Sequence, residues 1–377
     1  MKTKNGLTWA FAFAVVIPAL FAQTSPGLSG TWEAKPHEER VQLNLRHGSW
    51  GRDWNMGFSV KWADLRGLTA ASFSQDQPVR FELVRDAGTI TFDGATRGGR
   101  ASGDFRFAAS AEFTSGMAQL GFRNLSDQEL FSLAVHNVSR ATVSELRGLG
   151  YTSLSTDDLL SMGIHGATPE YIRELQSLGY RGLSVDALVS MRIHGVRPEY
   201  IREMGDLGYR SIPAEQLVSM RIHGVQPELV RTLKAQGYGT PPVDDLLSMR
   251  IHGVQPEFVR ELKALGYENI DPDNLVSMRI HGVSTGFIRE MNQLGYQRIS
   301  ADKLISMRIH GVQPEFVREL RELGYDRVSV DKLIEMRIHG VSAKFVRDVH
   351  SRGWKDVTVD ELIQMRIHGI GTRHGKV

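Results

Sequence analysis

The sequence predicts a mainly α-helical protein, an α-solenoid of nine two-helix repeats preceded by a small antiparallel β domain. Two columns of residues predict the repeats, because nine histidines and nine glycines each recur every 29 residues. The histidines are His136, His165, His194, His223, His252, His281, His310, His339 and His368. The glycines, each followed by an aromatic residue, are Gly121, Gly150, Gly179, Gly208, Gly237, Gly266, Gly295, Gly324 and Gly353. A fixed period of this length is typical of stacked units, since one unit cannot bury its apolar face alone.

The first residues predict export. Lys2 and Lys4 precede an apolar run at 7–17, and residues 18–22 form a small-residue exit. We therefore expect residues 1–22 to be a signal peptide, and the mature protein to be periplasmic or secreted. The apolar run is shorter than the roughly 20 residues of a membrane-spanning helix, and we expect no stable membrane span in the mature chain. The sequence contains no cysteine for a disulfide, a thiolate metal site or a lipid anchor.

Residues 23–109 predict a small β-rich domain. Apolar and polar residues alternate at 41–45, 79–84, 89–92 and 104–107, and turn residues separate these segments. We expect a small antiparallel sheet or barrel. Its tryptophans should form a core rather than a sugar-stacking platform, because a domain of this size needs large apolar side chains. The tryptophans are Trp32, Trp50, Trp54 and Trp62.

Residues 110–370 hold the nine repeats, and each repeat predicts a first helix that begins near a proline and ends at a glycine. Pro256 suits a first helical turn, Glu257 suits the positive end of the helix, and Gly266 stops it. The apolar residues of this helix are Phe258, Val259, Leu262 and Leu265, which fall at helical spacing. Residues 371–377 form a polar tail.

The second helix of each repeat should begin at a capping residue and end at a glycine such as Gly311. The capping residues are Ser126, Ser155, Ser184, Asp271, Ser300, Ser329 and Thr358, with proline at Pro213 and Pro242. The helix body continues through apolar residues such as Leu304, Ile305, Met307 and Ile309. The first repeat departs from the pattern at 134–137, where Ala-Val-His-Asn replaces Arg-Ile-His-Gly. We expect this terminal repeat to pack against the preceding domain.

The candidate binding residues are the histidine column and the arginine two residues before each histidine. They are Arg192, His194, Arg221, His223, Arg250, His252, Arg279, His281, Arg308, His310, Arg337 and His339. In a structural interpretation, both side chains meet the unpaired carbonyls and the negative dipole at the helix end. In a functional interpretation, they form a regularly spaced basic edge that holds an acidic or extended partner. A second arginine column, on the first helices, is mostly followed by an acidic residue, which predicts a solvated, cross-paired face.

The sequence gives little support for catalysis. Helices in neighbouring repeats pack about 8–10 Å apart, whereas zinc ligands lie about 2 Å from the ion, so one histidine column cannot share a metal. The chain also has no His-Glu-x-x-His segment and no serine or cysteine nucleophile motif. We therefore expect a protein that is not an enzyme and needs no metal or cofactor.

A nucleic-acid interpretation is also weak, although a helix, an Ile-His-Gly-Val turn and a second helix resemble the helix-hairpin-helix units of DNA-binding proteins. The second hairpin glycine is absent, and a Pro-Glu pair follows in five repeats, near the place of a phosphate. The chain has a formal net charge of +2, and its repeats contain 30 basic and 33 acidic residues. This balance is unfavourable for phosphate binding, and we expect no nucleic-acid partner.

The segment Met-Arg-Ile-His-Gly-Val-Gln-Pro-Glu-Phe-Val-Arg-Glu-Leu occurs whole at 249–262 and again at 307–320. It resembles the tandem helical tails of some bacterial sensor metallopeptidases of the β-lactam-receptor type, and the resemblance covers roughly residues 110–370. It implies a role in envelope sensing or signalling. The peptidase motif and the membrane helices of that family are missing here, so no catalytic residue is carried over.

These observations favour an exported, non-catalytic repeat scaffold that binds a protein or peptide along its length. The alternative is a structural or envelope-stress protein in which the repeats are a spacer and the β domain holds the ligand. A helix-hairpin-helix-like nucleic-acid binder is the third interpretation.

Overall fold

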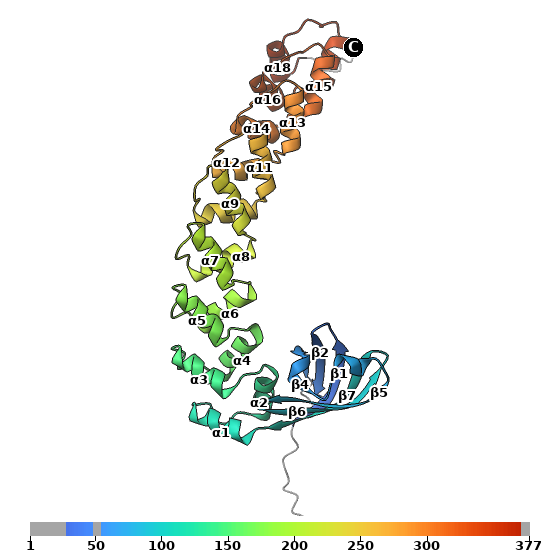
Figure 1. Ribbon diagram of the computed structural model, residues 1–377. Helices are drawn as coiled ribbons and strands as arrows, with labels where there is room; N and C mark the ends of the chain where they lie inside the picture. The colour runs from blue at the N-terminus through green and yellow to red at the C-terminus, as the bar shows by residue number, and fades with distance from the viewer. Residues whose placement is uncertain (1–27, 48–53, 371–377) are drawn as a thin grey trace, which may run out of the picture. The chain divides into compact units, whose positions relative to one another are not determined.

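The computed structural model describes residues 28–47 and 54–370 (Figure 1). The predicted signal peptide 1–22, Trp50 and the predicted tail 371–377 lie outside the described residues.

The N-terminal domain is a seven-stranded antiparallel sheet with the strand order β3-β2-β1-β7-β6-β5-β4. The strands are β1 (Ser29–Pro36), β2 (Arg40–His47), β3 (Trp54–Lys61), β4 (Leu65–Arg66), β5 (Gln77–Arg85), β6 (Gly88–Arg97) and β7 (Arg100–Ala109). The four predicted strand segments lie in β2, β5, β6 and β7, which confirms the antiparallel β domain. Strands β1, β3 and β4 were not predicted, because their apolar residues alternate less regularly.

The aromatic core of the sheet is centred on Trp32, which is 1% exposed. Its ring meets Phe81 and Phe92 edge-on, with ring centroids 5.0 and 5.7 Å away. Trp54 and Trp62 are half-buried, and each lies against a phenylalanine ring. The prediction that the tryptophans form a core is therefore confirmed for Trp32 and holds in part for these two.

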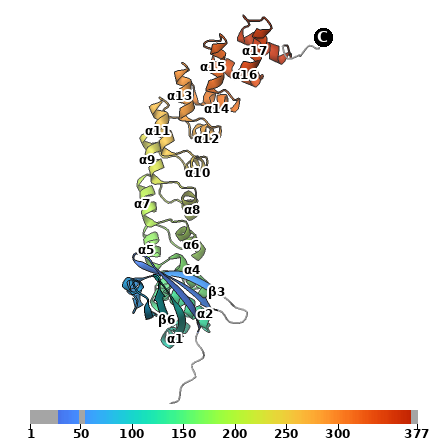
Figure 2. The same ribbon diagram turned by 90° about the vertical axis from the view of Figure 1, so that its right-hand side faces the viewer.

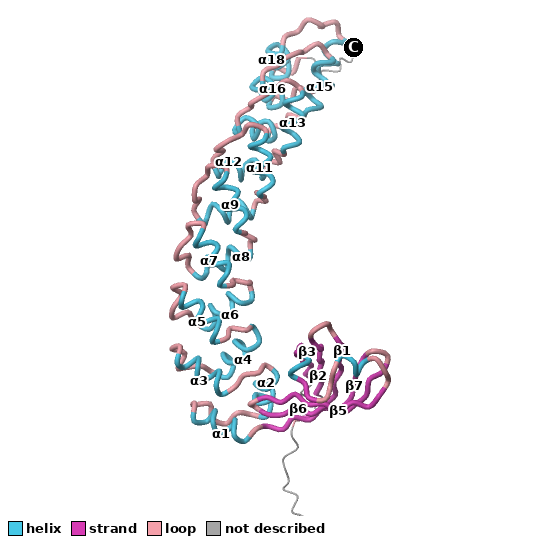
Figure 3. Tube along the Cα trace, viewed as in Figure 1, coloured by secondary structure: helices cyan, strands magenta, loops and turns pink. Residues whose placement is uncertain are grey.

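Eighteen helices follow the sheet in the described part of the chain, two for every 29 residues, as the repeat pattern predicts (Figure 3). The helices are α1 (Ala111–Gln119), α2 (Asp127–Val135), α3 (Arg140–Gly148), α4 (Thr156–His165), α5 (Pro169–Ser177), α6 (Val185–Ile193), α7 (Pro198–Asp206), α8 (Ala214–Ile222), α9 (Pro227–Ala235), α10 (Val243–Ile251), α11 (Pro256–Ala264), α12 (Pro272–Ile280), α13 (Thr285–Gln293), α14 (Ala301–Ile309), α15 (Pro314–Glu322), α16 (Val330–Ile338), α17 (Ala343–Ser351) and α18 (Val359–Ile367). No strand follows Ala109 among the described residues.

The predicted start and stop signals fix these helices. Pro256 occupies the first turn of α11, and Gly266 lies just beyond its end with φ of +85°, a conformation that favours glycine. The next residue, Tyr267, then donates its backbone N–H to the carbonyl of Leu262 at 3.0 Å. At α14 the Ser300 hydroxyl accepts a hydrogen bond from a backbone N–H of the first turn, as predicted for a capping residue.

Contacts divide the chain into two compact parts, one ending at Ile164 and the other beginning at His165. The N-terminal part holds the sheet and the first helices. The C-terminal part, from α5 onward, consists of one row of odd-numbered helices and one row of even-numbered helices (Figure 2). Consecutive helices of each row contact one another, so equivalent residues of successive repeats line up along the row.

The first repeat packs on the sheet within the N-terminal part. Helix α2 contacts β6 and β7, and Phe131 is fully buried. Its ring centroid lies 5.3–5.7 Å from the rings of Trp54, Phe105 and Phe107. This arrangement confirms that the irregular first repeat packs against the preceding domain. Its Val135, which occupies the place of the isoleucine of later repeats, is buried.

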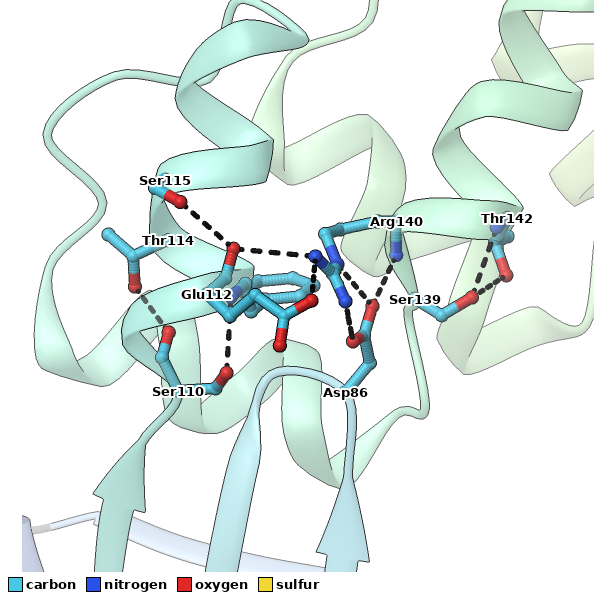
Figure 4. Close-up of polar contacts among 9 residues, drawn as sticks. Asp86, Ser110, Glu112, Thr114, Ser115, Ser139, Arg140 and Thr142 are labelled. Atoms are coloured by element: carbon cyan, nitrogen blue, oxygen red, sulfur yellow. Dashed lines mark hydrogen bonds and ion pairs between the residues drawn. The ribbon is translucent and has the colours of Figure 1, made fainter.

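A second attachment uses Arg140, in the first turn of α3 (Figure 4). Its backbone N–H donates to Asp86 at 2.8 Å, and its guanidinium donates to both carboxylate oxygens of Asp86 and, at 2.9 Å, to Glu112. Hydrogen bonds from Arg140 hold the pKa of the Asp86 carboxyl below its usual range. Five later repeats have proline at this position, which could not donate the amide bond. The presence of arginine in place of proline therefore adapts the second repeat to the sheet.

The Asp86–Arg140 contact gives a prediction for pH dependence. The folded-state pKa of Asp86 is lowered, so its contribution to stability is present above the unfolded value of about 3.9 and is lost as pH falls through the folded value. Asp86→Asn should reduce the free energy of unfolding by roughly 1–3 kcal/mol at neutral pH. Urea unfolding of the full chain should show this difference shrinking in acid. Equal destabilisation at every pH would contradict the assignment, and Glu112→Gln, at an exposed carboxylate, should cost less than about 1 kcal/mol.

The repeat packing gives a second prediction. Deletion of residues 226–254 joins Val225 to Gln255 and so recreates the Val-Gln junction of the intact chain. This variant should keep a cooperative thermal transition, because its new neighbours present the same packing surfaces. Deletion of residues 226–239 removes one helix of a pair and should broaden or abolish that transition, as measured by circular dichroism. Equal damage by both deletions would contradict the account.

Candidate functional site

The predicted arginine and histidine residues lie at the carboxyl ends of the even-numbered helices. The candidate binding residues fall on α6, α8, α10, α12, α14 and α16 of the C-terminal part, or on the residue just after each helix. Because these helices contact one another in sequence, their carboxyl ends form one continuous row, here called the even-helix edge. The structure thus brings the predicted residues together along a line rather than around one point.

The histidines of this edge are exposed. Each one follows the last helical residue, and its backbone N–H closes the final helical turn, as from His252 to the Ser248 carbonyl at 3.1 Å. None of the imidazoles of the six candidate histidines forms a hydrogen bond to another described residue. Within residues 28–47 and 54–370, no three histidine, aspartate or glutamate side chains come together in a way that could hold a metal ion.

The arginines of the edge are held by contacts, and most of them stack on an aromatic ring of the first helix of their own repeat. Arg279 donates its Nε–H to the Gly253 carbonyl at 3.0 Å, and its guanidinium carbon lies 5.0 Å from the ring centroid of Phe258. Such cation–π contacts contribute about 0.5–2 kcal/mol. The pairs of this kind are Arg192 with Tyr171, Arg221 with Tyr200, Arg279 with Phe258, Arg308 with Phe287, Arg337 with Phe316 and Arg366 with Phe345. Three of these arginines also donate their Nε–H to a carbonyl of the preceding repeat, namely Arg192 to His165, Arg279 to Gly253 and Arg337 to Gly311.

Arg250 is a natural exception in this column. The first helix of its own repeat has Leu229 where the neighbouring repeats have an aromatic residue, so no ring lies beneath the guanidinium. Arg250 donates to the Gln255 side-chain oxygen at 2.6 Å, and its buried Nε has no hydrogen-bond partner among the described residues. The stacked Arg308 makes the equivalent contact with Gln313 and has the same unpartnered Nε. Arg250 therefore differs from Arg308 in the missing ring, and it provides an internal control for the aromatic contact.

The arginines of the odd-numbered helices form a separate, paired column. Six of them form an ion pair with a glutamate of the preceding repeat. Arg260 pairs with Glu228, and in the other five pairs the two charged groups lie 2.6–3.2 Å apart. The other pairs are Arg202 with Glu174, Arg231 with Glu203, Arg289 with Glu261, Arg318 with Glu290 and Arg347 with Glu319. The predicted cross-paired face is confirmed. These side chains are about half exposed, so each pair contributes little alone.

Tyrosines that follow the repeat glycines hold the other end of the units together. The Tyr209 hydroxyl donates to the Pro241 carbonyl at 2.5 Å, and the Tyr296 hydroxyl to the Val328 carbonyl at 2.7 Å. Burial raises the pKa of Tyr209 to about 12, so this hydroxyl remains a donor at neutral pH. A cavity of about 860 Å³ opens beside Tyr296, but its Arg321 already donates to the Leu294 carbonyl. Arg321 of this cavity is therefore already engaged in a contact between repeats.

The sequence analysis missed an exposed isoleucine between each arginine and histidine of the edge. Ile309 was assigned to the apolar body of its helix, yet it is 53% exposed. The equivalent residues are Ile193, Ile222, Ile251, Ile280, Ile338 and Ile367, and all are 48–55% exposed. The signal was present in the spacing, because Ile309 follows the buried Met307 by two residues, or about 200° around a helix, and so points away from it.

No protein-family model matches the chain, and a search of curated proteins also gave no match. Over residues 28–47 and 54–370, none of the helices combines the length and the apolar character needed to cross a membrane.

The arginine contacts give a prediction with a control inside the same chain. Arg279→Gln removes the cation–π contact with Phe258 and the hydrogen bond to the Gly253 carbonyl of the preceding repeat. It should lower the free energy of unfolding by about 1–2 kcal/mol. Arg250→Gln, with no ring beneath it, should cost less than half as much. Introducing Leu229→Phe should raise the cost of Arg250→Gln towards that of Arg279→Gln. Chemical denaturation of the full chain measures all three, and equal costs at the two arginines would contradict the role of the ring.

Proposed function

We propose that this chain is an exported, non-catalytic scaffold that binds a protein or peptide partner along the even-helix edge. The observation that carries the proposal is the row of exposed isoleucine and histidine side chains, repeated in the same place in successive repeats. Single exposed apolar residues are ordinary on protein surfaces, but a regular row of them is typical of an interaction surface. Arrays of stacked repeats commonly present such extended surfaces.

The roles of the other columns support this choice. The odd-helix arginines pair with glutamates of the preceding repeat, and the tyrosine hydroxyls bind backbone carbonyls of the next repeat. The edge arginines stack on rings of their own repeat, and some also donate to a carbonyl of the preceding one. Each of these columns therefore has a structural role within the array. The exposed Ile and His side chains have no such task, and their burial by a partner would be favourable by roughly 25 cal/mol per Å² of apolar surface.

The site of action is inferred from the N-terminal sequence and from a resemblance. The pattern of residues 1–22 supports export, and the likeness to helical tails of bacterial sensor metallopeptidases supports a task in envelope sensing or signalling. The partner would then be an envelope protein or a segment of one.

A second candidate function is ligand binding by the sheet. A cavity of about 310 Å³ lies on the sheet, lined by side chains that include Glu33, Asn44 and Arg46. These polar side chains favour a small polar ligand, as in the structural or envelope-stress alternative. In that case the repeats would serve as a spacer.

Capture experiments with two matched variants separate the candidates. The full chain is immobilised, and envelope proteins that it retains are identified. A specific partner should be lost when His252, His281 and His310 of the edge are changed to Asp, because acidic groups then occupy the basic edge. The same partner should be retained by a sheet variant with Asn44→Ala and Arg46→Ser. Loss in the sheet variant, together with retention in the edge variant, would contradict the proposal and favour the alternative.

A further inference from the structure

The chemistry of the even-helix edge identifies the kind of ligand that it would take. Each repeat presents an isoleucine that is about half exposed, between an arginine and an exposed histidine. The segment Arg-Ile-His-Gly-Val is the same from Arg192 to Val341, and none of its copies contains an acidic residue. The edge therefore offers one apolar contact and one or two cationic groups per repeat.

The positive charge of the edge is not neutralised by neighbouring carboxylates. No edge arginine from Arg192 to Arg366 forms an ion pair in the described part of the chain, whereas the odd-helix arginines do. The carboxylates that follow the edge in sequence are engaged elsewhere, since Glu257 lies 3.0 Å from Arg260 of its own helix. The edge is therefore locally basic although the repeats as a whole are slightly acidic. An acidic ligand complements it.

The spacing of the isoleucines restricts the conformation of such a ligand. Packed helices lie about 8–10 Å apart, so successive isoleucines are separated by a similar distance along the row of even-numbered helices. A polyproline II segment has three residues per turn and rises about 3.1 Å per residue, which brings every third side chain to the same face about 9.3 Å further on. In a β-strand, successive side chains point to opposite faces, so a residue and the one three positions further on do not share a face. The polyproline II conformation thus matches the period of the edge.

We propose that the even-helix edge binds an extended peptide in the polyproline II conformation, with an apolar residue at every third position and carboxylates between them. The proposal rests on the proposed function, since it specifies the partner of that same surface. A second copy of this chain is a poorer occupant, because pairing two edges would bring arginine and histidine columns of like charge together.

A defined peptide tests the proposal directly. The probe is six copies of Leu-Pro-Glu carrying a fluorescent label, and its binding to the full chain is measured by anisotropy. The wild-type chain should bind it, and the triple variant Ile251→Ser, Ile280→Ser and Ile309→Ser should bind it roughly tenfold more weakly or worse. Because these isoleucines are half exposed, helix content and melting temperature should remain almost unchanged.

A matched control uses another row of partly exposed apolar residues. Leu265 and Leu294 each follow the last residue of an odd-numbered helix, and the equivalent residue of another repeat is Gln236. The double variant Leu265→Gln and Leu294→Gln should therefore fold and should bind the probe as the wild type does. If it loses binding as the isoleucine variant does, the contact is not specific to the edge and the proposal fails.

Three further arms test the stated chemistry. Six copies of Leu-Pro-Lys should not bind, because their charge matches that of the edge. A peptide of the same length and composition, with its six leucines moved out of the three-residue spacing, should bind at least about tenfold more weakly, because its apolar residues fall out of register. Raising the salt concentration should weaken binding of the Leu-Pro-Glu probe.

Several results would overturn the proposal. They are equal binding of the acidic and basic peptides, insensitivity to leucine spacing, absence of binding, and full binding by the isoleucine variant. Sedimentation that shows self-association of the wild type, lost in the isoleucine variant, would assign the edge to a second copy of the chain. If the captured envelope partner depends on the edge while the peptides fail, the proposed function stands and only the peptide chemistry is wrong. If capture does not depend on the edge, the proposed function itself is wrong.

Discussion

The packing of each repeat against the next is the constraint on which the rest of the structure depends. Most of the helices have nine residues, and isolated helices shorter than about 12–15 residues are marginal in water. Their stability must therefore come from neighbours, and residues such as Leu275, Met278 and Val283 are fully buried. Since every repeat must offer its neighbours the same surfaces, the 29-residue period is held along the array. The regular spacing of the exposed side chains is a consequence of this requirement.

Within that frame, the side-chain columns divide into two groups. The tyrosines, several edge arginines and the odd-helix ion pairs join one repeat to the next, through contacts such as Tyr296 to Val328 and Arg279 to the Gly253 carbonyl. The exposed isoleucines and histidines make no equivalent contact. The edge arginines therefore fit both the structural and the functional interpretation of the edge. The guanidinium stacks on an aromatic ring and still contributes positive charge to the surface.

Sequence reasoning predicted the repeats well because their signals are local. Pro256 and Gly266 mark one helix by restricting backbone angles, and the same signals recur in the other repeats. It predicted the candidate edge only in part. The arginine contacts with rings 21 residues earlier join the two helices of one repeat, and no pattern within a single helix reveals them. The exposure of Ile309 was obscured because isoleucine in a helix is usually buried. Strands β1 and β3 were missed, because their apolar residues alternate less regularly, and the pairing of β1 with β7 depends on a partner distant in sequence.

Native-state hydrogen exchange of the full chain tests the central claim most directly, namely that each repeat is stabilised by its neighbours. Interior helices such as α11 and α12 have a packed repeat on both sides, whereas α18 contacts only α16 within its row of the described chain. Amide protection should therefore be lowest at α17 and α18 and should rise over the next one or two repeats towards the interior. Protection that is equal in all repeats, or that varies with helix composition and not with position, would contradict the claim.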